Sequence, residues 1–411
     1  MDAWWKSWNE VRGLVKGKRV VFYGRSEDWV PKALPELPAP PEYLVDGNAA
    51  YDGTEFYGIG VSKVDRLAQD TANNIYVLIT AGSYTGIVET LIDMGLQPGQ
   101  QFCCCPAFRD YAYLEAMRVY EQQIIVTSPD YKDRSKTRYS RAGGGIFRYH
   151  LGSPGNEIEP LAQGNFRQIV ANGRYFYAVE FNECKVYVFD RDFKVVEKFA
   201  LDRPHYCGIE FDPKRKLLVL VNSGTDMISF HDAENFALVD RIHFSEKSDE
   251  TGPSHHHLND ACVAGDEMFV SYFSRSGNWK RNIFDGGISQ YNLERLDEPS
   301  VQMVDNLWMP HSPKIINGNL CYLESAPGKL YLANYAVTSR FPGFARGLAF
   351  DGRYYYIGQS ETMYLGRLFG TADTIMMNAG IYLFDAETRA SRFYPMLDNM
   401  NVHDLMVLPA A

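Results

Sequence analysis

Two stretches of the chain repeat the same pattern of polar and apolar positions. Each has an arginine, an apolar segment, an Asn-Gly or Asp-Gly pair and an aromatic segment, and they cover residues 167–177 and 346–356. Asn-Gly and Asp-Gly are strong hairpin signals, because both central residues of a type I′ turn take positive φ. Two copies of one hairpin pattern, far apart in the same chain, predict a structural repeat.

A second apolar strand pattern recurs six times, at intervals of about 40 to 60 residues. The copies are residues 145–150, 185–190, 227–232, 287–292, 329–334 and 380–385. About four short strands per interval of this length are typical of β-propeller blades. Residues 402–408 form a further strand with nothing after it, and the first copy lacks such a strand before it. We therefore predict a six-bladed β-propeller over residues 124–411, closed by the C-terminal strand, which removes exposed sheet edges.

The first 110 residues have a different pattern, in which apolar strands alternate with helical segments. Strands are expected at 18–24, 43–46, 75–80 and 101–105, and a helix at 84–94. Strands that alternate with helices indicate a parallel sheet covered on both faces. We predict a multidomain chain of α/β and all-β type, with a small Rossmann-like domain at 1–110 and a helical linker at 111–123.

Composition narrows the classes of partner. The 411 residues have a formal net charge of −10, and no basic stripe is present, which argues against nucleic acid. No apolar run of 18 residues and no signal peptide are evident. Cys103, Cys104 and Cys105 are adjacent, so we expect buried reduced thiols. We predict a cytoplasmic protein without a membrane partner and with possible homo-oligomerisation.

The propeller fold brings together residues that are far apart in sequence, because the innermost strand of each blade lines one central channel. Four blades have a histidine near that position, and two have an arginine. Imidazoles are common ligands of divalent transition metals such as Mn, Fe or Zn. Alternatively, the histidines bind channel waters and cap strand starts. The predicted metal ligands are His205, His257, His311 and His403.

The two arginines predict an anionic substrate. Arg167 and Arg346 can each hold a carboxylate or phosphate in bidentate fashion. The alternative is that each pairs with an acid of a neighbouring blade. His257, His311 and Glu324 are the candidate general acids and bases. Other candidates are Glu180, Asn222, Gln359 and Glu361, and Tyr206, Trp308 and Tyr364 could stack on a sugar ring or pack within blades.

The N-terminal segment carries the motifs Phe22-Tyr-Gly24, Val45-Asp-Gly-Asn48, Tyr57-Gly-Ile-Gly60 and Ile79-Thr-Ala-Gly82. It resembles the small Rossmann-like domain of several bacterial sugar-modifying proteins, including sugar C-methyltransferases and acyltransferases. A nucleotide could then bind at Gly24 and Asp46, although the turn after Gly24 lacks two glycines of the dinucleotide fingerprint. The alternative is a degenerate domain kept for docking or oligomerisation.

Residues 310–319, 324–330 and 342–350 resemble a family of uncharacterised bacterial propeller proteins. That family prefers arginine and tryptophan where this chain has Lys314 and Ile315. The histidine-bearing channel is also similar to that of metal-dependent propeller lyases acting on uronate sugars. The family resemblance supports the fold and the channel site. The channel histidines, the two arginines and the sugar-linked N-terminal domain together predict a metal-dependent lyase or epimerase acting on an anionic sugar or nucleotide sugar. The alternative is a non-catalytic scaffold propeller with a nucleotide-sugar-sensing N-terminal domain.

Overall fold

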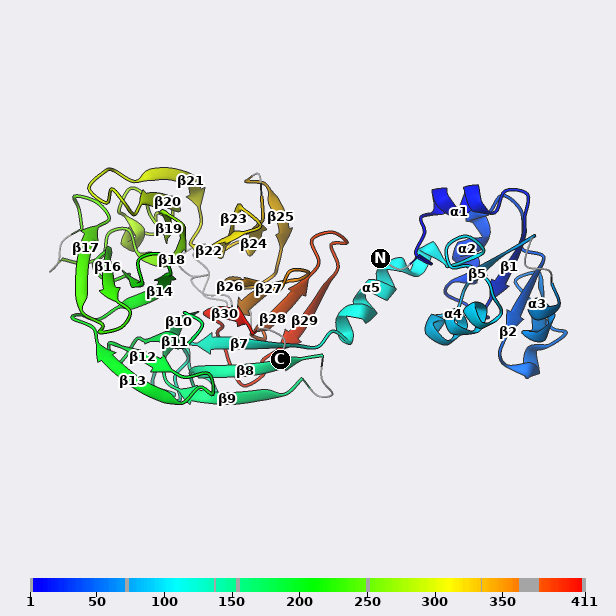
Figure 1. Ribbon diagram of the computed structural model, residues 1–411, viewed down its shortest axis with the longest axis horizontal. Helices are drawn as coiled ribbons and strands as arrows, with labels where there is room; N and C mark the ends of the chain where they lie inside the picture. The colour runs from blue at the N-terminus through cyan, green and yellow to red at the C-terminus, as the bar shows by residue number, and fades with distance from the viewer. Residues whose placement is uncertain are drawn as a thin grey trace. The chain divides into compact units, whose positions relative to one another are not determined.

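The computed structural model describes residues 3–70, 74–136, 138–152, 156–248, 252–333, 335–361 and 377–408. The chain forms two compact units, Met1–Ala116 and Met117–Ala411 (Figure 1).

The N-terminal unit is built on a six-stranded sheet in the order β3-β4-β2-β1-β5-β6. Parallel pairs join β1 to β2 and β5, β2 to β4, and β5 to β6, whereas β3 is antiparallel to β4. The predicted parallel sheet with helices is therefore confirmed. The strands are β1 Arg19–Tyr23, β2 Tyr43–Asp46, β3 Glu55–Phe56, β4 Ile59–Lys63, β5 Ile75–Ile79 and β6 Phe102–Cys104.

The helices of this unit are short, and the sequence accounts for several of their boundaries. Ser7 caps the first helix in a capping box with Glu10, and Pro31 lies in the first turn of the second. The helices are α1 Trp8–Leu14, α2 Val30–Ala33, α3 Asp65–Gln69, α4 Tyr84–Asp93 and α5 Arg109–Arg118, with 3₁₀ turns η1 Leu34–Glu36, η2 Ala49–Tyr51 and η3 Pro106–Phe108.

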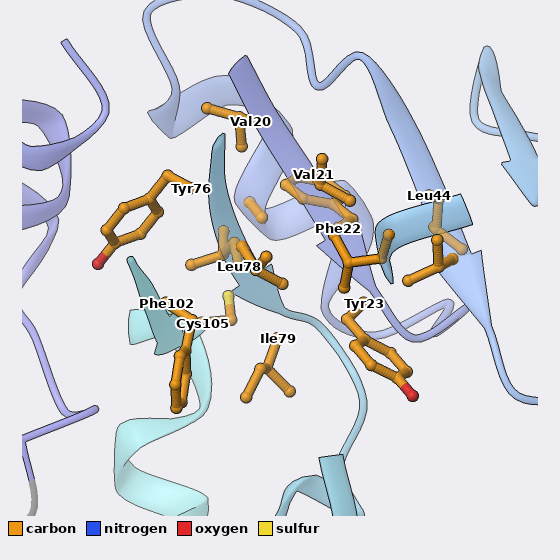
Figure 2. Packing of buried hydrophobic residues seen from close by; sticks show 14 of the residues in the cluster. Val20, Val21, Phe22, Tyr23, Leu44, Tyr76, Leu78, Ile79, Phe102 and Cys105 are labelled. Atoms are coloured by element: carbon orange, nitrogen blue, oxygen red, sulfur yellow. The ribbon is translucent and has the colours of Figure 1, made fainter. Parts of the chain in front are cut away.

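The core of this unit lies along the central strands. All five residues of β5 are buried, as a strand covered on both faces requires. Figure 2 shows side chains of β1, β2, β5 and β6, together with Cys105, in one packed cluster. Cys103, Cys104 and Cys105 are fully buried and take part in no disulfide, which agrees with the expected buried thiols.

The second unit consists of six antiparallel sheets of four strands each, so the predicted six-bladed propeller is confirmed. Each sheet is named here as a blade, with its innermost strand first. Blade I consists of β10 Phe166–Ala171, β11 Phe176–Glu180, β12 Lys185–Phe189 and β13 Val195–Ala200. Blade II consists of β14 Tyr206–Asp212, β15 Leu217–Asn222, β16 Met227–Asp232 and β17 Leu238–His243. Blade III consists of β18 Leu258–Ala264, β19 Glu267–Tyr272, β20 Gly286–Asn292 and β21 Val301–Leu307.

Blades IV to VI follow the same order, and a short 3₁₀ turn, η4 Trp279–Arg281, lies within blade III. Blade IV consists of β22 Pro310–Ile316, β23 Asn319–Glu324, β24 Lys329–Tyr331 and β25 Val337–Arg340. Blade V consists of β26 Phe344–Phe350, β27 Tyr355–Ser360, β28 Gly380–Phe384 and β29 Ser391–Pro395. Blade VI consists of β30 Asp404–Val407, β7 Gln122–Ser128, β8 Gly145–Leu151 and β9 Ile158–Gln163.

The ring closes as predicted, by the pairing of the C-terminal strand with the first strand of the propeller. Strand β30 runs antiparallel to β7, with Asp404 opposite Thr127 and Val407 opposite Ile124 (Figure 1). Blade VI thus combines the two ends of the propeller segment. The backbone hydrogen bonds between β30 and β7 thus join the two ends of the ring and leave no open sheet edge there.

The inner strands of blades I to V each contain a register shift, where an extra residue bulges from the ladder. Side chains at these shifts bond to the next blade. The Oε1 atom of Gln168 accepts from the backbone of Ile209 at 2.8 Å, and Oγ of Ser312 accepts from Gly347 at 2.9 Å. The bulges therefore serve to join neighbouring blades.

The two repeated hairpins form, but the predicted type I′ turn is wrong. Only Gly173 and Gly352 have positive φ, 85° and 99°, whereas Asn172 and Asp351 do not. The first strand residues pair across four-residue loops. The side chains of Asn172 and Asp351 accept backbone hydrogen bonds from the residues two and three positions later, so they stabilise the loops as Asx turns do.

Within the described residues, no helix has the length and apolar character needed to cross a membrane.

Candidate functional site

A cavity of about 100 Å³ lies among the inner strands of the propeller. All six blades contribute to its wall, and blade VI also contributes Arg138 from the connection between β7 and β8. The lining residues are Arg138, Arg167, Phe181, Cys207, Ser223, His257, Asn259, Phe273, His311, Phe344, Arg346 and His403.

Five of the residues singled out in the sequence therefore meet in this cavity, namely Arg167, His257, His311, Arg346 and His403. His205 is not among the lining residues. It lies one residue before β14 with a φ of 75°, its side chain is exposed, and its ring is 5.3 Å from that of Phe181. Cys207, two residues later on β14, lines the cavity instead.

His311 has a defined tautomer. Its Nδ1 lies 3.0 Å from the carbonyl oxygen of Met309 and 2.8 Å from Oγ of Ser325. A carbonyl oxygen only accepts, so Nδ1 carries the proton and Nε2 has a lone pair in the neutral ring. Burial, followed by the charge of Arg346, holds the pKa of His311 well below its usual value. The imidazole is therefore neutral at ordinary pH.

His403 lies one residue before β30 and is 4% exposed. Its ring is perpendicular to that of His311, with centroids 6.4 Å apart. Its Nδ1 is buried, and no described residue forms a hydrogen bond with this atom. Burial, and then the charges of Arg346 and Arg167, lower the pKa of His403 well below its usual value. His403 thus has a buried polar atom that the described part of the protein leaves unsatisfied.

Buried side chains hold Arg346. Its Nη2 donates to Oγ of Ser360 at 3.2 Å and to Oδ1 of Asn401 at 3.4 Å. Asn401 in turn donates to Oδ1 of Asp130 at 2.6 Å. The chain Asp130–Asn401–Arg346 runs through fully or almost fully buried groups, so it fixes the guanidinium orientation.

Arg167 is placed differently. Its guanidinium carbon lies 4.3 Å from the centroid of Phe181, which is within cation–π distance. It is half-buried, because it enters the cavity from the bulge of β10.

His257 has an unusual backbone, with a φ of 57°. Asp226, which the sequence analysis did not identify, accepts the backbone N–H groups of His255, His256 and His257 and so fixes this turn. The His257 ring packs 4.2 Å from that of Trp279. His256 contacts Ser245 and Ser274 within the blade instead, so His257 is the inward-facing member of the three.

Three arginine charges act on one residue of the cavity. The charges of Arg138, Arg167 and Arg346 all lower the pKa of His403. Among the described residues, no group of three or more His, Cys, Asp or Glu is placed so that it could hold a metal ion. Guanidinium groups repel cations, so the residues present fit an anion better than a metal. Metal binding by the four histidines stays a prediction, which elemental analysis of tag-free protein tests.

Glu324 lies at the end of β23 and is not among the lining residues. Its carboxylate accepts hydrogen bonds from the backbone of Trp308, from Lys329 at 3.0 Å and from the Tyr331 hydroxyl at 2.8 Å. The structure thus places it within blade IV, where it ties the turn to the outer strands.

Other residues at the ends of second strands do the same. Glu180, Asn222 and Gln359 all accept backbone hydrogen bonds from nearby turns. Glu361 is half-buried, and burial raises its pKa. The carboxylates and amides named from the sequence are therefore largely engaged in holding turns.

The three aromatic residues suggested for sugar stacking have different environments. Tyr206 is buried and its hydroxyl bonds to Ser229 and Asp202. Trp308 is 43% exposed and lies outside the cavity lining. Tyr364 lies outside the described residues.

A layer of buried ionisable groups accompanies the cavity residues on the inner strands. Asp260 accepts from the backbone of Ser312 at 2.7 Å, and Asp404 accepts from that of Ile169 at 3.2 Å. Burial raises the pKa of Asp260 to about 6 and that of Asp404 to about 7. Lys314 forms an ion pair with Glu210 at 3.7 Å, and its charge favours ionisation of both aspartates.

In the N-terminal unit, Asp46 lies at the end of β2 and Gly24 just after β1. The carboxylate of Asp46 accepts from the backbone of Arg25 and of Asn48, both at 2.8 Å. Gly24 has a φ of 108°, and a Cβ at this position would lie 2.3 Å from that of Ala81. Both residues thus have structural roles, and nucleotide binding by them stays a prediction.

Comparisons with known proteins find one similar domain family and no activity. The family described as a domain of unknown function (DUF4915) matches residues 213–407. No curated protein matches the chain. Among solved structures, a chain of the nidogen/laminin complex is similar with a TM-score of 0.45 and 9% identity, covering 70% of this chain and 98% of that one. A chain of Kuenenia stuttgartiensis hydrazine synthase is similar with a TM-score of 0.36 and 14% identity, covering 56% and 65%.

Proposed function

We propose that the propeller cavity binds the acid group of a small anionic molecule, held by Arg167 and Arg346. The observation that carries this proposal is the convergence of Arg138, Arg167 and Arg346 on His403 in one cavity. Guanidinium groups bind carboxylates and phosphates through paired hydrogen bonds, which are strong when water is excluded. His311 and His403 are neutral there, and no carboxylate is among the lining residues.

The size of the cavity restricts the part of the ligand that enters. An apolar cavity of about 150 Å³ holds a benzene molecule. A cavity of about 100 Å³ is therefore suited to a carboxylate or phosphate with only a few further atoms. A sugar acid would insert its acid end and leave the rest of the ring at the mouth.

We propose lyase or epimerase chemistry as the reaction class. Such a reaction begins when a base removes the proton on the carbon next to the acid group, and the electron pair moves into the carboxylate to give an enediolate. Arginine charges would stabilise this intermediate. Returning the proton to the other face would give an epimer, and expelling a β-substituent with its electron pair would give a lyase product. His311 and His257 are the two imidazoles available as the base, and for a ligand whose hydroxyl group engages Nε2 of His311 the base is His257.

The alternative is a propeller that binds the acid without changing it. One observation favours this alternative: Glu324, the predicted carboxylate acid or base, is engaged within blade IV. Solvent-exchange experiments separate the two. Sugar acids incubated with the protein in D₂O should lose the proton signal next to the acid group if the reaction occurs, and the His311→Phe variant should abolish this loss.

Isothermal titration with acetate, phosphate and a uronate tests the binding proposal. Arg346→Gln should weaken binding by about 10- to 100-fold, because a buried charged hydrogen-bond partner is lost. Arg353 is the matched control, since it is exposed and lies in the hairpin loop of the same blade. Arg353→Gln should leave the affinity unchanged. Equal affinities in the two variants, or no binding by the wild type, would overturn the proposal.

A further inference from the structure

We propose that the acid bound in this cavity is a hydroxy acid, whose hydroxyl group donates a hydrogen bond to Nε2 of His311. This inference rests on the proposed function, because the acid group of the same molecule is the one held by Arg346. It adds the chemical class of the ligand.

The first step concerns the hydrogen-bonding capacity of His311. Its Nδ1 is occupied by Met309 and Ser325, as described above. Among the described residues, no hydrogen bond is formed with Nε2. This nitrogen is therefore a lone-pair acceptor on the wall of the cavity, and it requires a donor from a bound molecule or water.

The second step concerns which donor fits. The oxygens of an ionised carboxylate only accept, so the acid group itself is poorly matched to Nε2. An ammonium group would donate, but Arg138 and Arg346 exert a positive potential at His311. A neutral hydroxyl donates without adding positive charge. Among common hydrogen-bond donors, the hydroxyl group thus fits both the lone pair of Nε2 and the positive potential at His311.

The third step concerns position. His311 and Arg346 lie on the inner strands of adjacent blades IV and V, and both line a cavity of about 100 Å³. The His311 ring is packed edge-on to Phe273 and Phe344, with centroids 5.3 and 5.6 Å away. These contacts fix the direction of Nε2. In so small a space, the hydroxyl must be close to the acid group, as in a 2-hydroxy acid.

Lactate and propionate form the matched pair of ligands for the test, because they differ by a single 2-hydroxyl group. In isothermal titrations, the wild type should bind lactate at least about tenfold more tightly than propionate, because a site that accepts the hydroxyl loses a hydrogen bond with the analogue. His311→Phe keeps a ring but removes the acceptor, so the ratio should fall to about one. Exposed His243→Phe should leave the ratio unchanged.

A second measurement guards against misfolding of the His311 variant. In ¹⁵N-labelled wild-type protein, the Nε2 resonance of His311 should shift when lactate is added and shift less with propionate. Equal affinity and equal shifts for the two acids would overturn the hydroxy-acid inference while leaving acid binding intact. If neither acid binds and phosphate and uronate also fail, the proposed function fails with it.

Discussion

Arg346 depends on side chains that do not line the cavity. Asn401 accepts from its Nη2 and donates to Asp130, and neither Asn401 nor Asp130 is among the lining residues. An arginine side chain that moves freely loses rotamer entropy when it binds an acid, whereas hydrogen bonds already order the guanidinium group of Arg346. Asn401 and Asp130 are thus positioning residues for the anion site.

We therefore predict that Asn401→Ala weakens acid binding by about tenfold, which corresponds to about 1.4 kcal/mol. Isothermal titration measures this loss. Asn319→Ala is the control, because Asn319 is exposed at the start of β23. Urea denaturation identifies the variants that remain folded. An unchanged affinity in folded Asn401→Ala would show that the chain from Asp130 does not act on Arg346.

Glu324 differs from these residues, since its contacts are with blade IV and the segment that leads into it. Glu324→Gln weakens three hydrogen bonds to a carboxylate, so we expect the free energy of unfolding to fall by roughly 1–3 kcal/mol. Acid affinity should not change. Denaturation and titration of the same variant make the two measurements, and a loss of binding or turnover without a loss of stability would restore Glu324 as a catalytic candidate.

Residue types in the sequence were sufficient to predict five of the lining side chains, because arginine and histidine at strand starts are informative. The sequence could not place His205, since a bulge moves the facing position by one or two residues. A shift of two residues leads to Cys207 and Asn259, both of which line the cavity. Arg138 gave no comparable signal, because it lies in a charged loop far from any inner strand in sequence.

At the scale of elements, the repeated strands and hairpins followed from the pattern alone. Apolar segments separated by turn residues indicate where the strands lie, and the same strand pattern occurs six times in the chain. The type of turn did not follow, because Asn-Gly fits several loop lengths and side-chain capping decides among them. In both hairpins the glycine alone has positive φ.

This arrangement predicts opposite effects of two glycine substitutions. Gly173→Ala should destabilise the propeller by about 1–2 kcal/mol, because alanine is strained at a φ of 85° even though the space is open. Gly86→Ala, within α4 and also in open space, should stabilise the N-terminal unit by about 0.5–1 kcal/mol. Thermal unfolding of each variant measures both effects. A neutral Gly173→Ala would contradict the assigned turn.

At the scale of the whole propeller, closure depends on one buried side chain as well as on the ladder between β30 and β7. Asp404, on the last strand, accepts from the backbone of Ile169 in blade I. This bond continues the series in which Gln168, Asp260 and Ser312 each join their blade to the next. That the ring closes was predictable from the last strand at 402–408, which has no further strands after it. The side chains that join the blades were not predictable, because the local geometry of the inner strands determines them.

Closure should therefore depend on pH. A carboxyl with a raised pKa binds its proton more tightly in the folded state. The stability contributed by Asp404 is complete below about pH 4, near the pKa of an unfolded aspartate. It is lost as the pH rises through about 7. Asp404→Asn keeps an acceptor for Ile169 without the charge, so we expect a gain of roughly 1–3 kcal/mol at pH 8.

Asp404→Ala should instead destabilise the propeller by roughly 1–3 kcal/mol at all pH values, because the Ile169 N–H loses its acceptor. Urea denaturation between pH 5 and pH 8 measures both variants. Some pH dependence should remain in Asp404→Asn, since the pKa of Asp260 is also raised, to about 6. An asparagine variant less stable than the wild type at pH 8 would show that the ionised aspartate is required for closure.

The central claim is that the channel cavity is an anion site. A crystal structure of the protein grown with selenate, recorded at the selenium absorption edge, tests it most directly. The account predicts an anomalous peak in the cavity, within hydrogen-bond distance of the Arg167 and Arg346 guanidinium groups and close to His403. Selenate bound only at the outer surface, with a metal ion among His257, His311 and His403, would contradict it.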